Sequence, residues 1–152
     1  MQYKLTTTLV FTKGAASAQK VLTKLQALPS KNPTLTEIIV GHNRDILTVS
    51  VEATGSALGI DAVEKALRQV PYDELAEPVV LTTTDENGEV LHAALGPDEE
   101  ACERVVALAY LDDMAQRAAD IGNESLTRAL AAARRFLEGE AAWAQNERGA
   151  RT

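Results

Sequence analysis

The spacing of hydrophobic residues changes repeatedly along residues 3–84, and the order of these changes restricts the fold more than any other feature. Residues 3–11 alternate between apolar and polar side chains, which is typical of a strand with one buried face. Residues 18–28 have helical spacing, and we expect Pro29 to end that helix. Further segments of strand (36–40), strand (45–53), helix (60–70) and strand (79–84) follow. This βαββαβ order is the split pattern of ferredoxin-like α+β folds, in which both helices cover one face of an antiparallel sheet.

A second hairpin and a change in composition follow this pattern. The Asn87-Gly88 pair between two apolar runs is a strong signal for a tight hairpin turn. We therefore predict an extra strand over residues 89–95 that extends the sheet or turns away from it. The composition changes at Gly96-Pro97, since β segments occur only before it and helical patterns dominate after it. The predicted organisation is a sheet module over 1–96, a helical hairpin over 97–145 and a flexible tail over 146–152.

The helical hairpin is outlined by its end signals. Gly96 as a permissive cap, Pro97 at the first helical position and acidic residues in the first turn predict a helix start. This helix is expected to run to about residue 121, where Gly122-Asn123 interrupts it. A second, alanine-rich helix is then predicted from about residue 124 toward Trp143.

Charge and cysteine content restrict the partners and the compartment. The formal net charge of -7 argues against a general nucleic-acid-binding protein, because such proteins must neutralise phosphates. The single cysteine, Cys102, excludes an intramolecular disulfide and suits a reducing compartment. The chain starts without a recognisable signal peptide and has no apolar run of membrane-spanning length. We therefore expect a cytoplasmic protein that does not associate with membranes.

The chain is poor in residues for metal or nucleophilic chemistry. Two histidines and one cysteine make a weak zinc set, and no zinc, calcium or nucleotide-binding motif occurs. We predict no metal and no cofactor. Acidic residues surround Cys102 and are expected to oppose the lowered thiol pKa that a helix N-terminus favours; they are Asp98, Glu99, Glu100 and Glu103.

Residues 42–45, with the sequence HNRD, raise the question of a small catalytic cluster. A base, a charge clamp and an orienting acid stand side by side there, but they lie between two β segments. The alternative, which we favour, is an exposed hairpin turn, since Asn and Gly tolerate the left-handed backbone of tight turns. His92, which alternates with apolar residues, is expected to be a partly buried strand histidine. The candidate residues for a small enzyme or a ligand-binding pocket between sheet and helices are His42, Arg44, His92 and Tyr72.

The first predicted helix has a basic strip that precedes the first acidic residue, Glu37; its members are Lys13, Lys20, Lys24 and Lys31. The start of this helix has no acid in its first turn, and a helix N-terminus attracts anions through its free N–H groups. The strip is therefore a candidate docking surface for a phosphate-bearing or acidic partner. A solvated helix face is the alternative, and we favour it.

The threonine-rich strand faces exclude one class of nucleic-acid-binding module. Four side chains are predicted to point away from the helices, namely Thr6, Thr8, Thr48 and Ser50. Exposed threonine is ordinary on a solvated antiparallel sheet. An RNA-recognition sheet would carry aromatic residues for base stacking at such positions, and none occur here.

The C-terminal hairpin is the predicted surface of self-association. Two helices alone make a thin hydrophobic core, so their apolar face needs the sheet module or a second copy of the chain. The larger apolar residues of the second helix form the predicted dimer interface: Leu126, Leu130, Phe136, Leu137 and Trp143. We expect a two-fold homodimer, and the alternative is a monomer whose hairpin covers the threonine-rich sheet face.

These observations favour a non-enzymatic, cytoplasmic interaction module whose partner is a protein, including a second copy of itself. One alternative is a small enzyme or ligand-binding regulator with a pocket between sheet and helices. Another is an anion or nucleic-acid contact through the lysine-bearing helix.

Overall fold

A computed structural model describes the backbone of residues 1–150 and the side chains of residues 1–139. The chain divides into two compact units, Met1–Cys102 and Glu103–Thr152. The first unit includes the predicted sheet module, whose expected boundary at Gly96-Pro97 lies shortly before this division.

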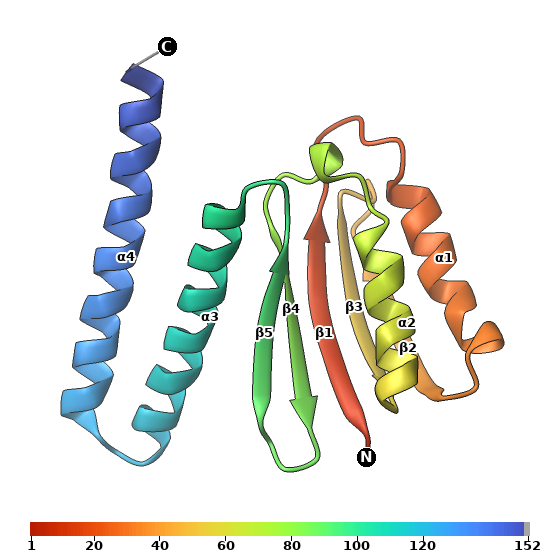
Figure 1. Cartoon of the computed structure of the whole chain (residues 1–152), viewed down its shortest axis with the longest axis horizontal. Coiled ribbons are helices and arrows are strands. Elements are labelled where there is room, and N and C mark those ends of the chain that lie inside the picture. The colour runs from red at the N-terminus through yellow and green to blue at the C-terminus, as the bar shows by residue number, and fades with distance from the viewer. Residues whose placement is uncertain (151–152) are drawn as a thin grey trace. The chain divides into compact units, whose positions relative to one another are not determined.

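The first unit is a five-stranded antiparallel sheet with two helices on one face (Figure 1). Its elements in chain order are β1 (Tyr3–Val10), α1 (Ala18–Lys31), β2 (Leu35–His42), β3 (Thr48–Gly55), α2 (Ala57–Arg68), the short 3-10 helix η1 (Tyr72–Glu74), β4 (Val79–Asp85) and β5 (Val90–Leu95). The strand order is β2-β3-β1-β4-β5. The first four strands have the ferredoxin-like topology, which confirms the predicted fold. The strand β5 pairs with β4 and so extends the sheet.

The core of this unit follows from the alternation of side chains along the strands. Leu5 and Leu9 of β1 and Val49 of β3 are fully buried on the face that α1 and α2 cover. Leu25 of α1 and Val63 of α2 are equally buried from the helix side. A continuous apolar layer between one sheet face and two amphipathic helices stabilises the unit.

The second unit consists of most of α3 (Glu99–Asp120) and of α4 (Glu124–Ala150). The break between them is where the sequence predicts it. Gly122 has a φ of 74°, which glycine adopts without strain, and its N–H and that of Asn123 donate to the carbonyls of Ala119 and Ala118. The side-chain oxygen of Asn123 then accepts the N–H of Leu126 at 3.1 Å and caps α4. The helix α4 includes residues 146–150 of the predicted tail, and residues 151 and 152 lie outside the described part.

Two helix ends differ from the sequence prediction. Pro29 does not end α1, which continues to Lys31. Proline removes one backbone hydrogen bond, and in the last turn of a helix few bonds remain to be disturbed. The cap of α3 is Asp98 rather than Gly96, since the Asp98 carboxylate accepts the N–H of Ala101 at 3.2 Å.

Two glycines, Gly55 at the end of β3 and Gly59 in α2, allow their elements to approach the start of β2 closely. A Cβ atom at Gly59 would lie 2.8 Å from the carbonyl oxygen of Thr34 and 2.9 Å from the amide nitrogen of Leu35. A Cβ atom at Gly55 would lie 2.7 Å from the same Thr34 oxygen. These contacts are with backbone atoms, which cannot rotate away as a flexible side chain can.

The substitution Gly59→Ala is therefore expected to destabilise the protein by about 1–3 kcal/mol, because the added methyl group overpacks this contact. The usual effect in a helix interior has the opposite sign, since alanine has a helix propensity about 1 kcal/mol better than glycine. Gly139→Ala in α4 is the matched control, because nothing lies within 4 Å of its Cβ position. Urea unfolding measures the change in unfolding free energy for each variant. A Gly59→Ala protein that is more stable than the unmutated chain would contradict the packing argument.

Candidate functional site

The HNRD segment ends β2 and forms a hairpin turn. The side-chain oxygen of Asn43 accepts the backbone N–H groups of Leu47 at 2.8 Å and Thr48 at 3.1 Å. Residues 42–45 are all exposed. The positive φ of the turn, 54°, falls on Ile46 rather than on the Asn or Gly that the sequence favours for it. The geometry is that of a hairpin turn in which the Asn43 side chain accepts hydrogen bonds from the backbone.

This arrangement predicts different effects for two adjacent substitutions. Asn43→Ala removes the acceptor of two N–H groups and is expected to cost about 1–2 kcal/mol of unfolding free energy. His42→Ala is expected to change stability by less than about 0.5 kcal/mol, as at other exposed sites. Denaturant unfolding compares the two variants. A larger loss of stability for His42→Ala than for Asn43→Ala would favour a functional role for the HNRD segment.

The register of the sheet separates the two histidines. His42 pairs with Val49, whose side chain is buried on the helix-covered face. His92 pairs with Thr82, and Thr82 pairs with Thr6 on the opposite face. The two histidines also lie on opposite edge strands, four strand spacings or about 19 Å apart. They cannot contribute to one pocket.

The remaining pocket candidates are also distributed over the unit. His92 is buried, with 8% of its surface exposed, and its Nδ1 lies 2.9 Å from the hydroxyl oxygen of Thr82. Tyr72 begins η1, between α2 and β4, and Arg44 lies in the turn between β2 and β3. The structure does not assemble these residues with His42 around a common cavity.

The N-terminus of α1 holds an anion that belongs to the protein itself. The Glu74 carboxylate accepts the N–H groups of Ala16 and Ser17, each at 3.2 Å, and the Ser17 hydroxyl. Free N–H groups at a helix start attract negative charge, and Glu74 satisfies this tendency from a distant part of the chain. Sequence analysis missed this residue because its partners lie 57 and 58 positions away.

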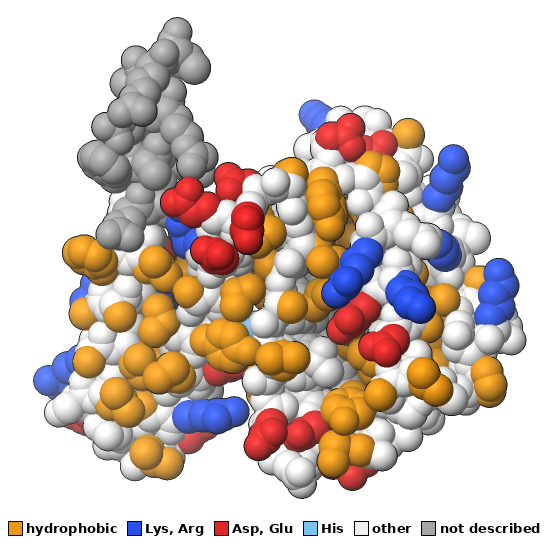
Figure 2. All heavy atoms as spheres, viewed as in Figure 1, with side chains coloured by type: hydrophobic (Ala, Val, Ile, Leu, Met, Phe, Trp, Pro, Cys, Tyr) orange, Lys and Arg blue, Asp and Glu red, His pale blue; other side chains and the backbone are white. Residues whose placement is uncertain are grey.

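The lysine strip itself is exposed. All four lysines are exposed, and Lys24 donates to the side-chain oxygen of Gln69 beyond α2. Figure 2 shows Lys and Arg side chains over the α1 and α2 side of the first unit. A phosphate at this surface would meet lysine ammonium groups, whereas the amides of Ala16 and Ser17 are already bonded.

Loss of the internal anion has a measurable consequence. Glu74→Ala leaves the Ala16 and Ser17 amides without their acceptor and is expected to lower stability by about 1–2 kcal/mol. The exposed neighbour Asp73, on the same short helix, provides the control substitution Asp73→Ala. Thermal and urea unfolding of both variants test the role, and equal losses would refute it.

The sheet face opposite to α1 and α2 contains a groove of about 500 Å³. Its floor carries hydroxyl groups of β1, β3 and β4, and Ile39, Pro78 and Val80 supply apolar contacts. Two carboxylates line it, Glu52 and Glu77, and Glu52 forms an ion pair of 2.7 Å with Lys4. Thr6, Thr8 and Ser50, which the sequence predicts to point away from the helices, belong to this floor. Hydroxyl groups and a paired carboxylate can hydrogen-bond a small polar molecule.

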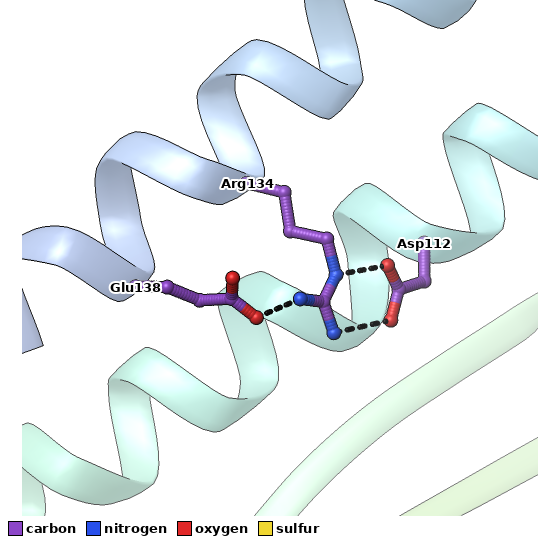
Figure 3. A network of polar contacts seen from close by, with 3 residues as sticks. All are labelled: Asp112, Arg134 and Glu138. Atoms are coloured by element: carbon purple, nitrogen blue, oxygen red, sulfur yellow. Dashed lines mark hydrogen bonds and ion pairs between the residues drawn. The ribbon is translucent and has the colours of Figure 1, made fainter.

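The helix α4 carries apolar residues over one wide surface. Leu130 is buried, Leu137 is half-buried, and both lie on the side that Arg134 shares. Figure 3 shows Arg134 directed to Asp112 of α3, with a distance of 2.6 Å between Nε and the carboxylate, and to Glu138 of its own helix. The hydrogen bond to Asp112 raises the pKa of the Arg134 guanidinium. This side therefore faces α3.

A stripe of α4 that adjoins this side is open to solvent. Leu126 is 42% exposed and Phe136 is 71% exposed, and Ala129 and Ala133 between them are also exposed. Of the predicted interface residues, Leu130 is buried and Leu137 is half-buried, whereas Leu126 and Phe136 are exposed. Trp143 lies outside the residues whose side chains are described.

Cys102 has a protected thiol. Partial burial raises its pKa, and the charges of Asp98 and Glu99 raise it further. This agrees with the expected effect of its acidic neighbours, and it lowers the thiolate fraction on which nucleophilic attack depends.

The described part of the chain has neither a metal-binding cluster nor a membrane-spanning helix. Within residues 1–139, no three His, Cys, Asp or Glu side chains are placed to hold a metal ion. No described helix combines the length and the hydrophobicity needed to cross a membrane.

Comparison with known proteins gives likeness in fold only. No protein-family model and no curated protein matches the chain. Rv0793 from Mycobacterium tuberculosis is 14% identical, with 56% of this chain and 94% of that one covered and a TM-score of 0.43. SO0527 from Shewanella oneidensis is 12% identical, with 62% and 93% covered and a TM-score of 0.41. A dimeric ferredoxin-like protein of unknown function from Jannaschia sp. CCS1 is 16% identical, with 64% and 100% covered and a TM-score of 0.36. These weak similarities carry no argument about binding or activity.

Proposed function

We propose that the protein is a non-enzymatic cytoplasmic interaction module that self-associates through its helical hairpin as a two-fold dimer. The observation that carries this proposal is the contrast in burial between the two units. The first unit has a continuous core of buried aliphatic and aromatic residues. In α3 and α4, the buried hydrophobic residues among those described are Ala118 and Leu130.

The large apolar residues of the hairpin are left in contact with water. The exposed fractions are 50% for Met114, 78% for Ile121, 42% for Leu126 and 71% for Phe136. Hydrophobic side chains are numerous on the visible surface of the hairpin in Figure 2. Full burial of one such side chain contributes about 1.5–3 kcal/mol, and a second copy offers the same apolar groups in return.

Other observations support an interaction role over catalysis or nucleic-acid binding. The two histidines lie on opposite faces and opposite edges of the sheet. The Glu74 carboxylate already lies at the start of α1, where it accepts the N–H groups of Ala16 and Ser17, and its negative charge opposes the binding of an anion there. The net charge of -7 opposes a general affinity for nucleic acid. The single thiol supports a reducing compartment.

The mass of the protein in solution tests the proposal. Light scattering after size exclusion is expected to give a dimer at tens to hundreds of micromolar, a range suited to a micromolar dissociation constant. Leu126→Asp combined with Phe136→Asp is expected to give a folded monomer, because both side chains are already exposed in the single chain. Leu58→Asp is the matched control, since Leu58 of α2 is 71% exposed and lies in the other unit.

Each outcome of this experiment has a clear meaning. A dimer that the hairpin variant disrupts and the control leaves intact supports the proposal. A monomer at every concentration refutes it. The second candidate function, binding of a small polar molecule in the sheet-face groove, would then remain. The volume of that groove, about 500 Å³, is within the range of about 300–1,000 Å³ typical of small-molecule sites.

A further inference from the structure

The open stripe of α4, which adjoins the side that faces α3, has the spacing of a helix-pairing seam. Leu126, Ala129, Ala133 and Phe136 follow one another at intervals of three, four and three residues. This is the spacing of the two apolar positions in a heptad, which keeps side chains aligned along a contact between two helices. All four are exposed, so the seam (these four residues) is unoccupied in the single chain. The inference that follows rests on the proposed self-association.

The surroundings of the seam select an apolar partner. Helical geometry places three small uncharged residues along one flank, and these are Ser125, Ala132 and Gly139. The other flank holds Leu130 and Leu137, on the side of α4 that faces α3. The side chain of Arg134 is directed away from the seam, to Asp112 of α3. A nucleic acid or an acidic segment would meet no positive charge on the seam. A second copy of this seam would meet apolar side chains along its whole length.

We propose that α4 pairs with α4 of a second copy in antiparallel orientation through this seam. In that register Leu126 lies opposite the partner's Phe136, and Ala129 lies opposite the partner's Ala133. Each end of the contact then combines one leucine with one phenylalanine, so the helices keep the same separation at both ends. The central alanines permit close approach, and opposed helix dipoles add a favourable term.

A parallel pair fits the same residues less well. It would place leucine against leucine at one end and phenylalanine against phenylalanine at the other, so the separation would change along the seam. It would also align the two helix dipoles in the same direction. The antiparallel pair has a two-fold axis perpendicular to the helices, and both copies then use identical surfaces.

The seam is short, and this sets the expected strength of the dimer. Residues 124–139 of a helix extend over about 24 Å. A contact of that length buries less than the roughly 800 Å² per partner of a standard protein interface. We therefore expect association in the micromolar range rather than the nanomolar range.

Cysteine cross-linking distinguishes the two orientations. The full chain with Cys102→Ser receives either Ala129→Cys or Ala133→Cys, both at exposed positions. Under mild oxidation, a mixture of the two variants is expected to form a disulfide-linked dimer that neither variant forms alone. Only the antiparallel register brings residue 129 of one copy to residue 133 of the other, within the Cα separation of about 4.4–6.8 Å that a disulfide requires. Leu58→Cys in the same background measures cross-linking by random collision.

Two results would overturn the antiparallel seam while leaving the proposed self-association in place. The first is disulfide formation within each variant alone and none specific to the mixture, which would indicate a parallel pair. The second is the absence of cross-links above the Leu58→Cys level in a chain that light scattering shows to be dimeric. A chain that is monomeric by light scattering would instead remove both the seam and the proposed function.

Discussion

The period of two along the strands governs the organisation of the first unit. Because successive side chains point to opposite faces, one register assigns every strand residue either to the helix-covered core or to the open face. The pairing of His42 with Val49 and of His92 with Thr82 places the two histidines on different faces. The same register collects hydroxyl groups on the open face, where the groove lies. A shift of one residue would exchange the two faces and expose the core.

Several polar side chains that could bind a ligand instead accept hydrogen bonds from the backbone of the chain itself. Asn43 supplies the acceptor for two backbone amides of its hairpin turn. Glu74 accepts the N–H groups of Ala16 and Ser17 and so joins η1 to the N-terminus of α1. Buried or partly buried polar groups need partners, and a partner supplied by the chain itself leaves less for a ligand. The open positions are instead apolar side chains of the hairpin and the hydroxyl-lined groove.

In the helical hairpin, α3 and α4 bury only part of each other's apolar surface. Leu130 and the ion pair between Arg134 and Asp112 join α4 to α3 on one side. The adjoining stripe of α4 keeps Leu126 and Phe136 in solvent, because a further layer is needed to bury it. The proposed interaction through α4 rests on this excess of apolar surface, and the proposed placement of a second copy rests on the heptad spacing.

The sequence by itself determined the order of elements and several of their ends. The βαββαβ pattern and the breaks at Asn87-Gly88 and Gly122-Asn123 depend on side-chain periodicity and on turn residues, which act over a few positions. The tertiary structure alone decided that Gly59 meets the backbone of Thr34 and that Leu130 is buried while Leu126 and Phe136 stay exposed. These features depend on which distant segments come into contact. Contacts of that kind arise from packing of the whole unit, and local sequence preferences do not specify them.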